Sequence, residues 1–390
     1  KADLPALPID DVLTDICLAL KDGPRLVLAA PPGAGKTTRV PLALAGLLEA
    51  RGVIEGRILM LEPRRIAARM AAQQMAKSLG EPLGKTVGLT TRVDRKISDA
   101  TRVEVITDGL FTRRILSDPE LAGVGAVIFD EFHERRLNSD LGLSLALESQ
   151  SVLRDDLRIL IMSATLDTET VSKCVDAPVI ESLGRQYPVE TRYLGRSDDR
   201  IEDRMAAAVR RALREEEGSI LAFLPGAGEI RRTAERLEDL PGSVHVAPLY
   251  GALSPAEQDA AVSPAPEGMR KVVLATDIAE SALTIEGVRI VIDSGLARVA
   301  EDDAGGLGSR LITVKASRAS VDQRRGRAGR SRERSTGSSS GPRAGRRGAG
   351  RRPAHHPPRR GTASYGRARW RPVPCARPRA TACCAAMALK

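Results

Sequence analysis

The stretch that decides the fold runs from Leu26 to Thr38 and reads Leu-Val-Leu-Ala-Ala-Pro-Pro-Gly-Ala-Gly-Lys-Thr-Thr. Its apolar start, Leu26–Ala30, predicts a buried strand, and the residues after the loop predict a helix. Glycines between a strand and a helix let backbone N–H groups surround phosphate oxygens, and a helix N-terminus favours an anion. We therefore expect a phosphate-binding loop formed by Gly33, Ala34, Gly35, Lys36, Thr37 and Thr38.

Two side chains of this loop carry the predicted chemistry. Lys36 is expected to reach the β- and γ-phosphates, and Thr37 is expected to hold Mg²⁺. The loop departs from the common pattern at Ala30, where a glycine usually stands. A chance glycine-rich turn is the alternative, which the strand before the loop and the helix after it disfavour. The expected cofactors are ATP and Mg²⁺.

An acidic cluster, Asp130-Glu131-Phe132-His133, follows the apolar run Val124–Phe129. A carboxylate at the carboxyl end of a parallel strand lies where open α/β sheets bind ligands. Asp130 therefore suits Mg²⁺, and Glu131 suits the attacking water, because phosphoryl transfer needs mainly positioning and charge neutralisation. A solvated loop is the alternative for an isolated acidic pair. A metal site through His133 lacks Cys or His partners at ligand spacing.

Short apolar runs alternate with amphipathic stretches along the chain, which predicts an α/β fold with mainly parallel sheets. The expected strands are Leu26–Ala30, Ile58–Glu62, Val103–Ile106, Val124–Phe129, Arg158–Met162, Ser219–Leu224, Val244–Ala247, Lys271–Ala275 and Val288–Ile292. The expected helices include Ile66–Leu79, Asn138–Ser149, Ile201–Glu217 and Ala227–Leu240. The strands form two groups separated by the polar stretch Glu181–Arg200. At 390 residues we expect two domains, 1–181 and 182–330, followed by a tail, 331–390.

The charge of the chain is unevenly distributed. The tail carries 14 Arg and one Lys against Glu333, whereas the whole chain has a net charge of +10. A nucleic-acid site before the tail must therefore be a local stripe of arginines. The five cysteines show no paired spacing, and no apolar run approaches the roughly 20 residues of a membrane span. No signal-peptide pattern opens the chain, so we expect a cytoplasmic protein without a membrane partner.

The tail is rich in Arg, Pro and Gly and is expected to be disordered, because it has little apolar surface to bury. The favoured interpretation is translation in a wrong reading frame, since a GC-rich gene read out of frame yields Arg, Ala, Gly and Pro. A native RNA-binding arm is the second interpretation. A zinc site is the third, although its candidate ligands lack ligand spacing: His355, His356, Cys375, Cys383 and Cys384.

Taken together, these motifs resemble the DEAH-box group of superfamily 2 helicases, and most closely the bacterial HrpB-type branch. The resemblance covers roughly residues 10–330, where the motifs occur in the family's order. It implies two RecA-like domains, with ATP between them and RNA as the partner, single-stranded or with a single-stranded overhang. Phe132 stands where the family usually has Ala, as in the HrpB-type branch.

The resemblance assigns further residues in the first domain. Glu62-Pro63-Arg64-Arg65 is similar to a motif that contacts the RNA backbone, which implies that Arg64 and Arg65 bind RNA. Thr107-Asp108-Gly109 resembles another strand-contacting motif, and all three of its residues are therefore RNA candidates. Ser163-Ala164-Thr165 resembles the motif that couples hydrolysis to strand separation. The coupling candidates are His133, Ser163 and Thr165.

In the second domain, Phe223–Gly226 and Leu249–Gly251 resemble RNA-facing segments. Ala275–Ser281 resembles a motif that touches RNA through Thr276 and the nucleotide through Asp277, although family members often carry Asn at the latter position. The last motif runs from Gln323 to Arg330. By resemblance, Gln323 orients the water and the γ-phosphate, and Arg327 and Arg330 act as arginine fingers, because guanidinium groups neutralise phosphoryl oxygens. An arginine-rich solvated helix face is the alternative.

A β-hairpin is expected between these last two motifs, because Ile290–Asp293 and Arg310–Val314 flank Gly305-Gly306. In the family a hairpin at this place lies against the RNA duplex junction, and an ordinary surface hairpin is the equal alternative. The family's winged helix and helical bundle do not follow Arg330. The alternatives to an RNA helicase are therefore a truncated ATPase core or nucleic-acid-binding remnant that unwinds poorly, and a DNA translocase. Backbone contacts grip a strand without base preference, and the preference for RNA rests on the resemblance alone.

Overall fold

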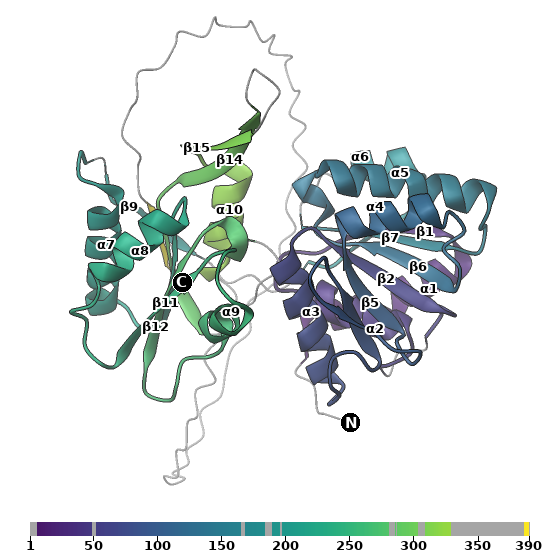
Figure 1. Cartoon of the computed structure of the whole chain (residues 1–390), viewed down its shortest axis with the longest axis horizontal. Coiled ribbons are helices and arrows are strands. Elements are labelled where there is room, and N and C mark those ends of the chain that lie inside the picture. The colour runs from purple at the N-terminus through teal and green to yellow at the C-terminus, as the bar shows by residue number, and fades with distance from the viewer. Residues whose placement is uncertain are drawn as a thin grey trace, which may run out of the picture. The chain divides into compact units, whose positions relative to one another are not determined.

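The computed structural model describes residues 6–48, 52–164, 168–183, 189–195, 197–280, 285, 287–302, 309–328 and 386–389. Within these residues the chain forms two α/β domains in series, each with its own mainly parallel sheet. Figure 1 colours the first domain purple to teal and the second teal to green. The predicted fold class is confirmed for the described part of the chain.

The first sheet has eight strands in the order β4-β3-β5-β2-β6-β7-β1-β8, all parallel to their neighbours except β4. Its strands are β1 (Arg25–Ala29), β2 (Arg57–Glu62), β3 (Val87–Thr90), β4 (Arg95–Lys96), β5 (Val103–Thr107), β6 (Val124–Phe129), β7 (Arg158–Ser163) and β8 (Val179–Glu181). Its helices are η1 (Pro8–Val12), α1 (Leu13–Asp22), α2 (Lys36–Leu44), α3 (Arg65–Ser78), α4 (Asp108–Ser117), η2 (Phe132–Glu134), α5 (Leu137–Val152) and α6 (Thr168–Val175). The expected strands of this half all form, with bounds that shift by no more than one residue.

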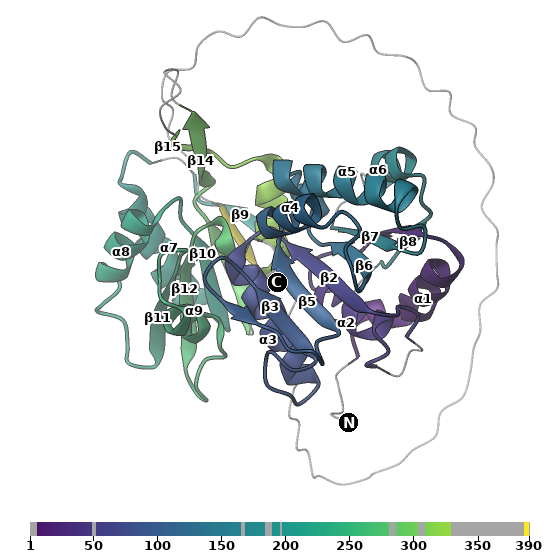
Figure 2. The ribbon, with the colours of Figure 1, turned by 45° about the vertical axis from the view of Figure 1, so that its right-hand side comes forward.

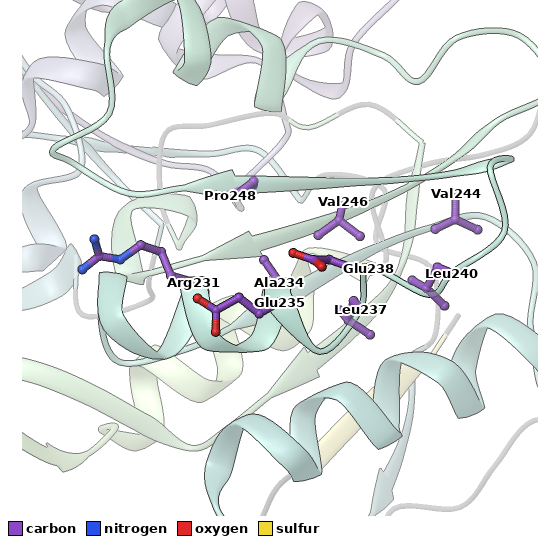
Figure 3. Close-up of a pocket in the computed structure, with 9 residues that line it drawn as sticks. All are labelled: Arg231, Ala234, Glu235, Leu237, Glu238, Leu240, Val244, Val246 and Pro248. Carbon is purple, nitrogen blue, oxygen red and sulfur yellow. The ribbon is translucent and has the colours of Figure 1, made fainter.

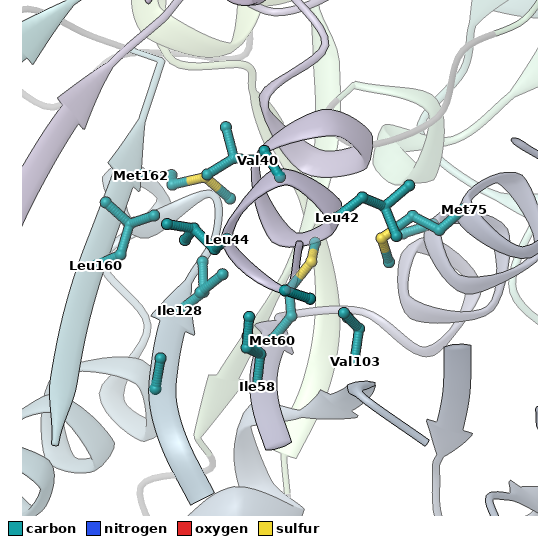
Figure 4. Close-up of a cluster of buried hydrophobic side chains, with 14 of the residues drawn as sticks. Val40, Leu42, Leu44, Ile58, Met60, Met75, Val103, Ile128, Leu160 and Met162 are labelled. Carbon is teal, nitrogen blue, oxygen red and sulfur yellow. The ribbon is translucent and has the colours of Figure 1, made fainter. Parts of the chain in front are cut away.

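Helices cover both faces of this sheet, with α4, α5 and α6 on one face and α1, α2 and α3 on the other (Figures 1 and 2). Each central strand is therefore buried on both sides, which is why its sequence is continuously apolar rather than alternating. Figure 4 shows Leu44 of α2 packed against Ile128 and Leu160 of neighbouring strands. This packing holds α2, and the loop that precedes it, against the carboxyl edge of the sheet.

The second sheet has the order β11-β12-β10-β13-β16-β9, parallel from β11 to β13 and antiparallel beyond. Its strands are β9 (Glu190–Tyr193), β10 (Ser219–Phe223), β11 (Val244–Leu249), β12 (Arg270–Ala275), β13 (Val288–Asp293) and β16 (Ala386–Leu389). Its helices are α7 (Ile201–Glu215), α8 (Ala227–Glu235), α9 (Pro255–Val262), η3 (Asp277–Ala279) and α10 (Arg318–Gly326). The strand β16 falls in the segment predicted to be a tail, and the rest of that segment lies outside the described residues.

The predicted hairpin forms with a different first strand. Residues Ile290–Asp293 belong to β13, the central strand beside β10, where Ile290 and Ile292 are buried. The hairpin instead joins β14 (Leu296–Asp302) to β15 (Ser309–Lys315). The earlier run is more apolar, so burial in the core sheet takes precedence over pairing at the surface. The glycines expected at the turn lie outside the described residues.

None of the described helices is both long enough and apolar enough to span a membrane.

Candidate functional site

The phosphate-binding loop joins β1 to α2 as the sequence predicts. Gly33 and Gly35 adopt φ values of +85° and +97°, in the left-handed region that glycine reaches without steric cost. An added Cβ at Gly35 would stand 2.6 Å from Cδ1 of Leu7. The backbone N–H of Ile9 also donates to the carbonyl oxygen of Ala34 at 3.0 Å. The segment before α1 thus packs against the phosphate-binding loop through Leu7 and Ile9. Helix α2 begins at Lys36.

The first residues of α2 meet the acidic cluster at the end of β6. The Lys36 ammonium lies 3.1 Å from Oε1 of Glu131 and 3.8 Å from Oδ1 of Asp130. The Thr37 hydroxyl donates to Oδ2 of Asp130 at 2.5 Å, across 93 residues of sequence. Lys36 and Thr37 begin the helix that follows β1, and Asp130 and Glu131 directly follow β6. All four therefore lie at the carboxyl edge of the parallel sheet, where open α/β sheets bind ligands. The structure therefore brings the two predicted motifs together.

Burial and charge set the protonation of these groups. Burial raises the pKa of Asp130 to about 6, although the neighbouring Lys36 opposes this shift. Burial alone would also raise the pKa of Glu131, but the positive charge of Lys36 lowers it below its usual range. Glu131 is therefore ionised at neutral pH. An ionised carboxylate can accept a hydrogen bond from a water molecule and orient it.

The backbone around Glu131 is strained. Its φ is +49°, a left-handed value that is uncommon for a residue with a Cβ. Its N–H donates to Oδ1 of Asp130 at 2.7 Å, which holds the turn in place. Strain of this kind persists where the surrounding structure over-determines the conformation, and it gathers at functional sites. The turn directs the carboxylate of Glu131 toward Lys36 instead of continuing the strand.

His133 connects three segments. Its Nδ1 accepts a hydrogen bond from the backbone N–H of Ala164, the residue after Ser163 at the end of β7, at 3.2 Å. Nδ1 thus serves as an acceptor in the neutral ring, and the other ring nitrogen, Nε2, lies 3.3 Å from Oε2 of Glu131. The side-chain Nε2 of Gln323 lies 2.5 Å from the same ring nitrogen. Burial lowers the pKa of His133, which favours this neutral state. His133 thus contacts the residue that follows the coupling candidate Ser163, and Thr165 lies outside the described residues.

Of the two predicted arginine fingers, Arg327 is described and Arg330 lies outside the described residues. Arg327 is buried, and its Nε and Nη2 donate to the carbonyl oxygen of Glu280 at 3.0 and 2.7 Å. Burial raises the pKa of Glu131, and the positive charge of Arg327 helps to lower it, although less than the charge of Lys36 does. Arg327 therefore influences the acidic cluster electrostatically.

Some of the side chains predicted to contact RNA are exposed, and others already pair with residues of the protein. Arg65 begins α3 and is exposed. Arg64 donates to the carbonyl oxygen of Asp277 at 3.0 Å and to its carboxylate at 3.1 Å, and it also lies 3.6 Å from Glu134. An RNA candidate and a nucleotide candidate thus pair with each other. Thr276 precedes η3 as its N-cap residue and is partly exposed.

The residues of the second predicted RNA-contacting motif, Thr107-Asp108-Gly109, also differ in exposure. Thr107 and Gly109 are partly exposed at the start of α4, but Asp108 is buried. The Ser139 hydroxyl of α5 donates to the Asp108 carboxylate at 2.5 Å, and burial raises the pKa of Asp108. This carboxylate therefore joins two helices, and it does not face solvent as an RNA-contacting group would.

Sequence reasoning missed two buried charged residues. Arg324 is the largest fully buried side chain among the described residues, and it pairs with Glu280 and Asp293. Glu62 is buried at the end of β2, beside the acidic cluster. The sequence signal for Glu62 was present, since this acidic residue stands at the end of an apolar run, much as Asp130 directly follows one. No comparable signal marked Arg324, which sits among other arginines.

A pocket of about 440 Å³ lies in the second domain between α8 and β11 (Figure 3). Apolar side chains such as Leu237, Val244 and Val246 line it, with Arg231 and Glu235 among its polar residues. It contains none of the predicted site residues. The cluster around Lys36 is therefore the better candidate site.

Both domains of the chain match known protein families. The family model described as DEAD/DEAH box helicase matches residues 12–174, and the model described as Helicase conserved C-terminal domain matches residues 204–332. The chain is 51% identical over 330 residues to the ATP-dependent RNA helicase HrpB of Escherichia coli (strain K12), covering 84% of this chain and 40% of that protein. It is 39% identical to the ATP-dependent RNA helicase HrpA of the same organism, covering 83% of this chain and 25% of that protein.

A crystal structure of the E. coli DEAH/RHA helicase HrpB is similar with a TM-score of 0.78 at 51% identity, covering 83% of this chain and 41% of that one. A crystal structure of the E. coli DExH-box NTPase HrpB is similar with a TM-score of 0.72. This chain thus spans less than half the length of these relatives.

Proposed function

Because the chain belongs to the DEAD/DEAH-box helicase family, we propose that it is the ATP-hydrolysing core of an RNA helicase. In this proposal the two RecA-like domains cover residues 1–181 and 182–330, and the protein works in the cytoplasm. The observation that carries the proposal is the convergence of Lys36 and Thr37 with Asp130 and Glu131.

The residues present suit a magnesium nucleotide. The Thr37 hydroxyl and the Asp130 carboxylate offer adjacent hard oxygen ligands, which Mg²⁺ prefers. These two residues would hold the Mg²⁺, which would supply positive charge to neutralise the phosphates. Lys36, now held by two carboxylates, would turn to the β- and γ-phosphates, while backbone N–H groups of Gly33, Ala34, Gly35 and Thr38 would surround them.

Glu131 is the proposed residue that orients the attacking water, because it stays ionised at neutral pH. Gln323 would orient the same water and the γ-phosphate, close to the ring of His133. Arg327 and Arg330 would neutralise the phosphoryl oxygens, and such fingers are worth about 10³–10⁵ in rate. Asp277 would contact the nucleotide once Arg64 releases it.

RNA is the proposed partner, because the relatives named above are RNA helicases. We expect it to be single-stranded or to carry a single-stranded overhang. Its phosphates and sugars would be gripped by Arg64, Arg65, Thr107, Gly109 and Thr276, without base preference. Asp108 would support this surface from within. His133 with Ser163 and Thr165 would report the state of the nucleotide to this surface.

The Lys36→Ala variant tests the proposal. We expect it to abolish RNA-stimulated ATP hydrolysis and to leave the circular dichroism spectrum unchanged, since the lysine is needed for phosphate binding. Lys21→Ala is the control, because Lys21 is an exposed residue of α1. Normal turnover by the Lys36 variant would refute the site. Equal stimulation by DNA and RNA would instead favour a DNA translocase.

A further inference from the structure

Glu62 stands beside the proposed magnesium ligand. It is the last residue of β2, which pairs with β6 so that Leu61 lies opposite Phe129. The backbone N–H of Asp130 donates to the carbonyl oxygen of Leu61 at 3.1 Å. Glu62 therefore ends β2 at the level at which Asp130 directly follows the neighbouring strand β6.

The two carboxylates also share a face of the sheet. Side chains alternate between the two faces along a strand, so residues two apart point the same way. Met60 and Ile128, two residues before Glu62 and Asp130, belong to the core cluster that packs beneath α2. Glu62 thus points to the face on which α2 begins with Lys36, and the Lys36 charge acts on its carboxylate.

The Glu62 carboxylate is buried without a hydrogen-bond partner. The residue is 0% exposed, and no donor among the described residues bonds to either of its oxygens, since its close polar neighbour is the acidic side chain of Asp130. Its acidic neighbour Glu131 already receives the Lys36 ammonium at 3.1 Å. Buried polar groups in folded proteins are nearly always hydrogen-bonded, so two unused acceptors need an explanation.

Glu104 shows how the same sheet treats an ordinary buried glutamate. It lies on the neighbouring strand β5 and is 2% exposed. Its carboxylate receives hydrogen bonds from Arg57 at 3.0 Å, Arg114 at 3.2 Å and Thr90 at 2.7 Å. Burial of a carboxylate is therefore compensated within the protein at Glu104, whereas the acceptors of Glu62 remain for donors from outside the protein.

We propose that Glu62 is a positioning residue of the divalent-cation site and accepts a hydrogen bond from a water molecule in the hydration shell of the cation. A protein-bound Mg²⁺ usually keeps several waters, which are hydrogen-bond donors. The role is through water because β6 and β7 separate β2 from β1, the strand that leads to the phosphate-binding loop. The inference rests on the nucleotide site proposed above.

Manganese binding tests the proposal without relying on turnover. Mn²⁺ would be titrated into protein saturated with ADP, and free Mn²⁺ would be measured by electron paramagnetic resonance. We expect Glu62→Gln to weaken Mn²⁺ binding about tenfold, the usual loss when an outer-shell partner of a metal is removed. Binding of ADP in EDTA should stay unchanged, because Glu62 contacts no phosphate.

The control variant is Glu104→Gln, which places an amide in the same sheet away from the cluster. It should lower the thermal midpoint and leave Mn²⁺ affinity unchanged. Glu62→Asp withdraws the carboxylate by one methylene and should also weaken Mn²⁺ binding, which keeps the test valid if the glutamine variant fails to fold. Unchanged Mn²⁺ affinity in a folded Glu62 variant would overturn the proposal.

The wild-type protein separates this failure from failure of the proposed function. If the wild-type protein bound no ADP in the presence of Mn²⁺, the proposed nucleotide site would be refuted, and the proposed role of Glu62 with it. If the wild-type protein and the Glu62→Gln variant bound Mn²⁺ with equal affinity, only the proposed role of Glu62 would be refuted.

Discussion

Replacing Arg324 with leucine should destabilise the second domain strongly. Arg324 is 1% exposed, and its guanidinium donates to Glu280 at 3.1 Å, to Asp293 at 2.9 Å and to the carbonyl oxygen of Leu296 at 3.1 Å. It also lies 5.0 Å from the ring centroid of Phe223. Arg324 thus holds α10 against the carboxyl ends of β10 and β13.

The expected loss of stability follows from the buried charges that would lose their partner when leucine replaces Arg324. Removal of one partner from a buried ion pair costs about 3–5 kcal/mol, because the remaining charge stays buried without compensation. Here two carboxylates, at Glu280 and Asp293, would lose that partner. Arg325 provides the control, since its ion pair with Asp322 at 3.2 Å is exposed. Loss of such a surface pair costs about 0–1 kcal/mol.

Native-state hydrogen exchange followed by mass spectrometry measures both effects in the intact chain. We expect Arg324→Leu to lower protection of β10 and β13 peptides by at least about 100-fold, which corresponds to the lower end of that range. Peptides from β2 and β6 in the first domain should be unchanged, as should every peptide of Arg325→Leu. Equal protection in the two leucine variants would refute the structural role of Arg324.

Two further predictions concern the candidate site. Gly35→Ala should lower the thermal midpoint and abolish nucleotide binding, because the new Cβ would clash with Leu7 in a left-handed backbone. Gly80→Ala is its control, since Gly80 is also left-handed but has open space around it, and equal effects of the two changes would contradict the clash. The second prediction concerns pH. Burial lowers the pKa of His133 below 6.5, so the unfolded chain binds more protons there than the folded one. The free energy of unfolding should therefore fall as pH falls through 6.5, because protonation of Nδ1 breaks the hydrogen bond from Ala164. His133→Gln should flatten this slope in urea titrations, and an unchanged slope would exclude His133 as its source.

Several features were predictable because their signals are local. The run Leu26–Thr38 contains a strand, a glycine-rich loop and a helix start within a few residues, and β1 and α2 form where expected. The central strands were recognisable because burial on both faces leaves continuous apolar runs. The resemblance to a known family then supplied site residues that spacing could not, among them Gln323, which lies beside His133.

Other features were misread because they depend on competition between distant segments. The hairpin was expected from Ile290–Asp293, but that run completes the core sheet and leaves Leu296–Asp302 to pair with β15. Asp108 looked like a surface contact in its motif, yet α5 brings Ser139 against it. A sequence pattern does not say which of two compatible partners a segment will meet.

The amino-acid sequence by itself determined the type of domain, the phosphate-binding loop and the acidic cluster, because each depends on residues close together in the chain. Only the tertiary structure decided how charges are compensated. Lys36 is held by Glu131, Arg324 is shared between two carboxylates, and Glu62 is left without a donor. The physical reason is that solvation and partner distance set the energy of a buried charge, and both are properties of the folded chain.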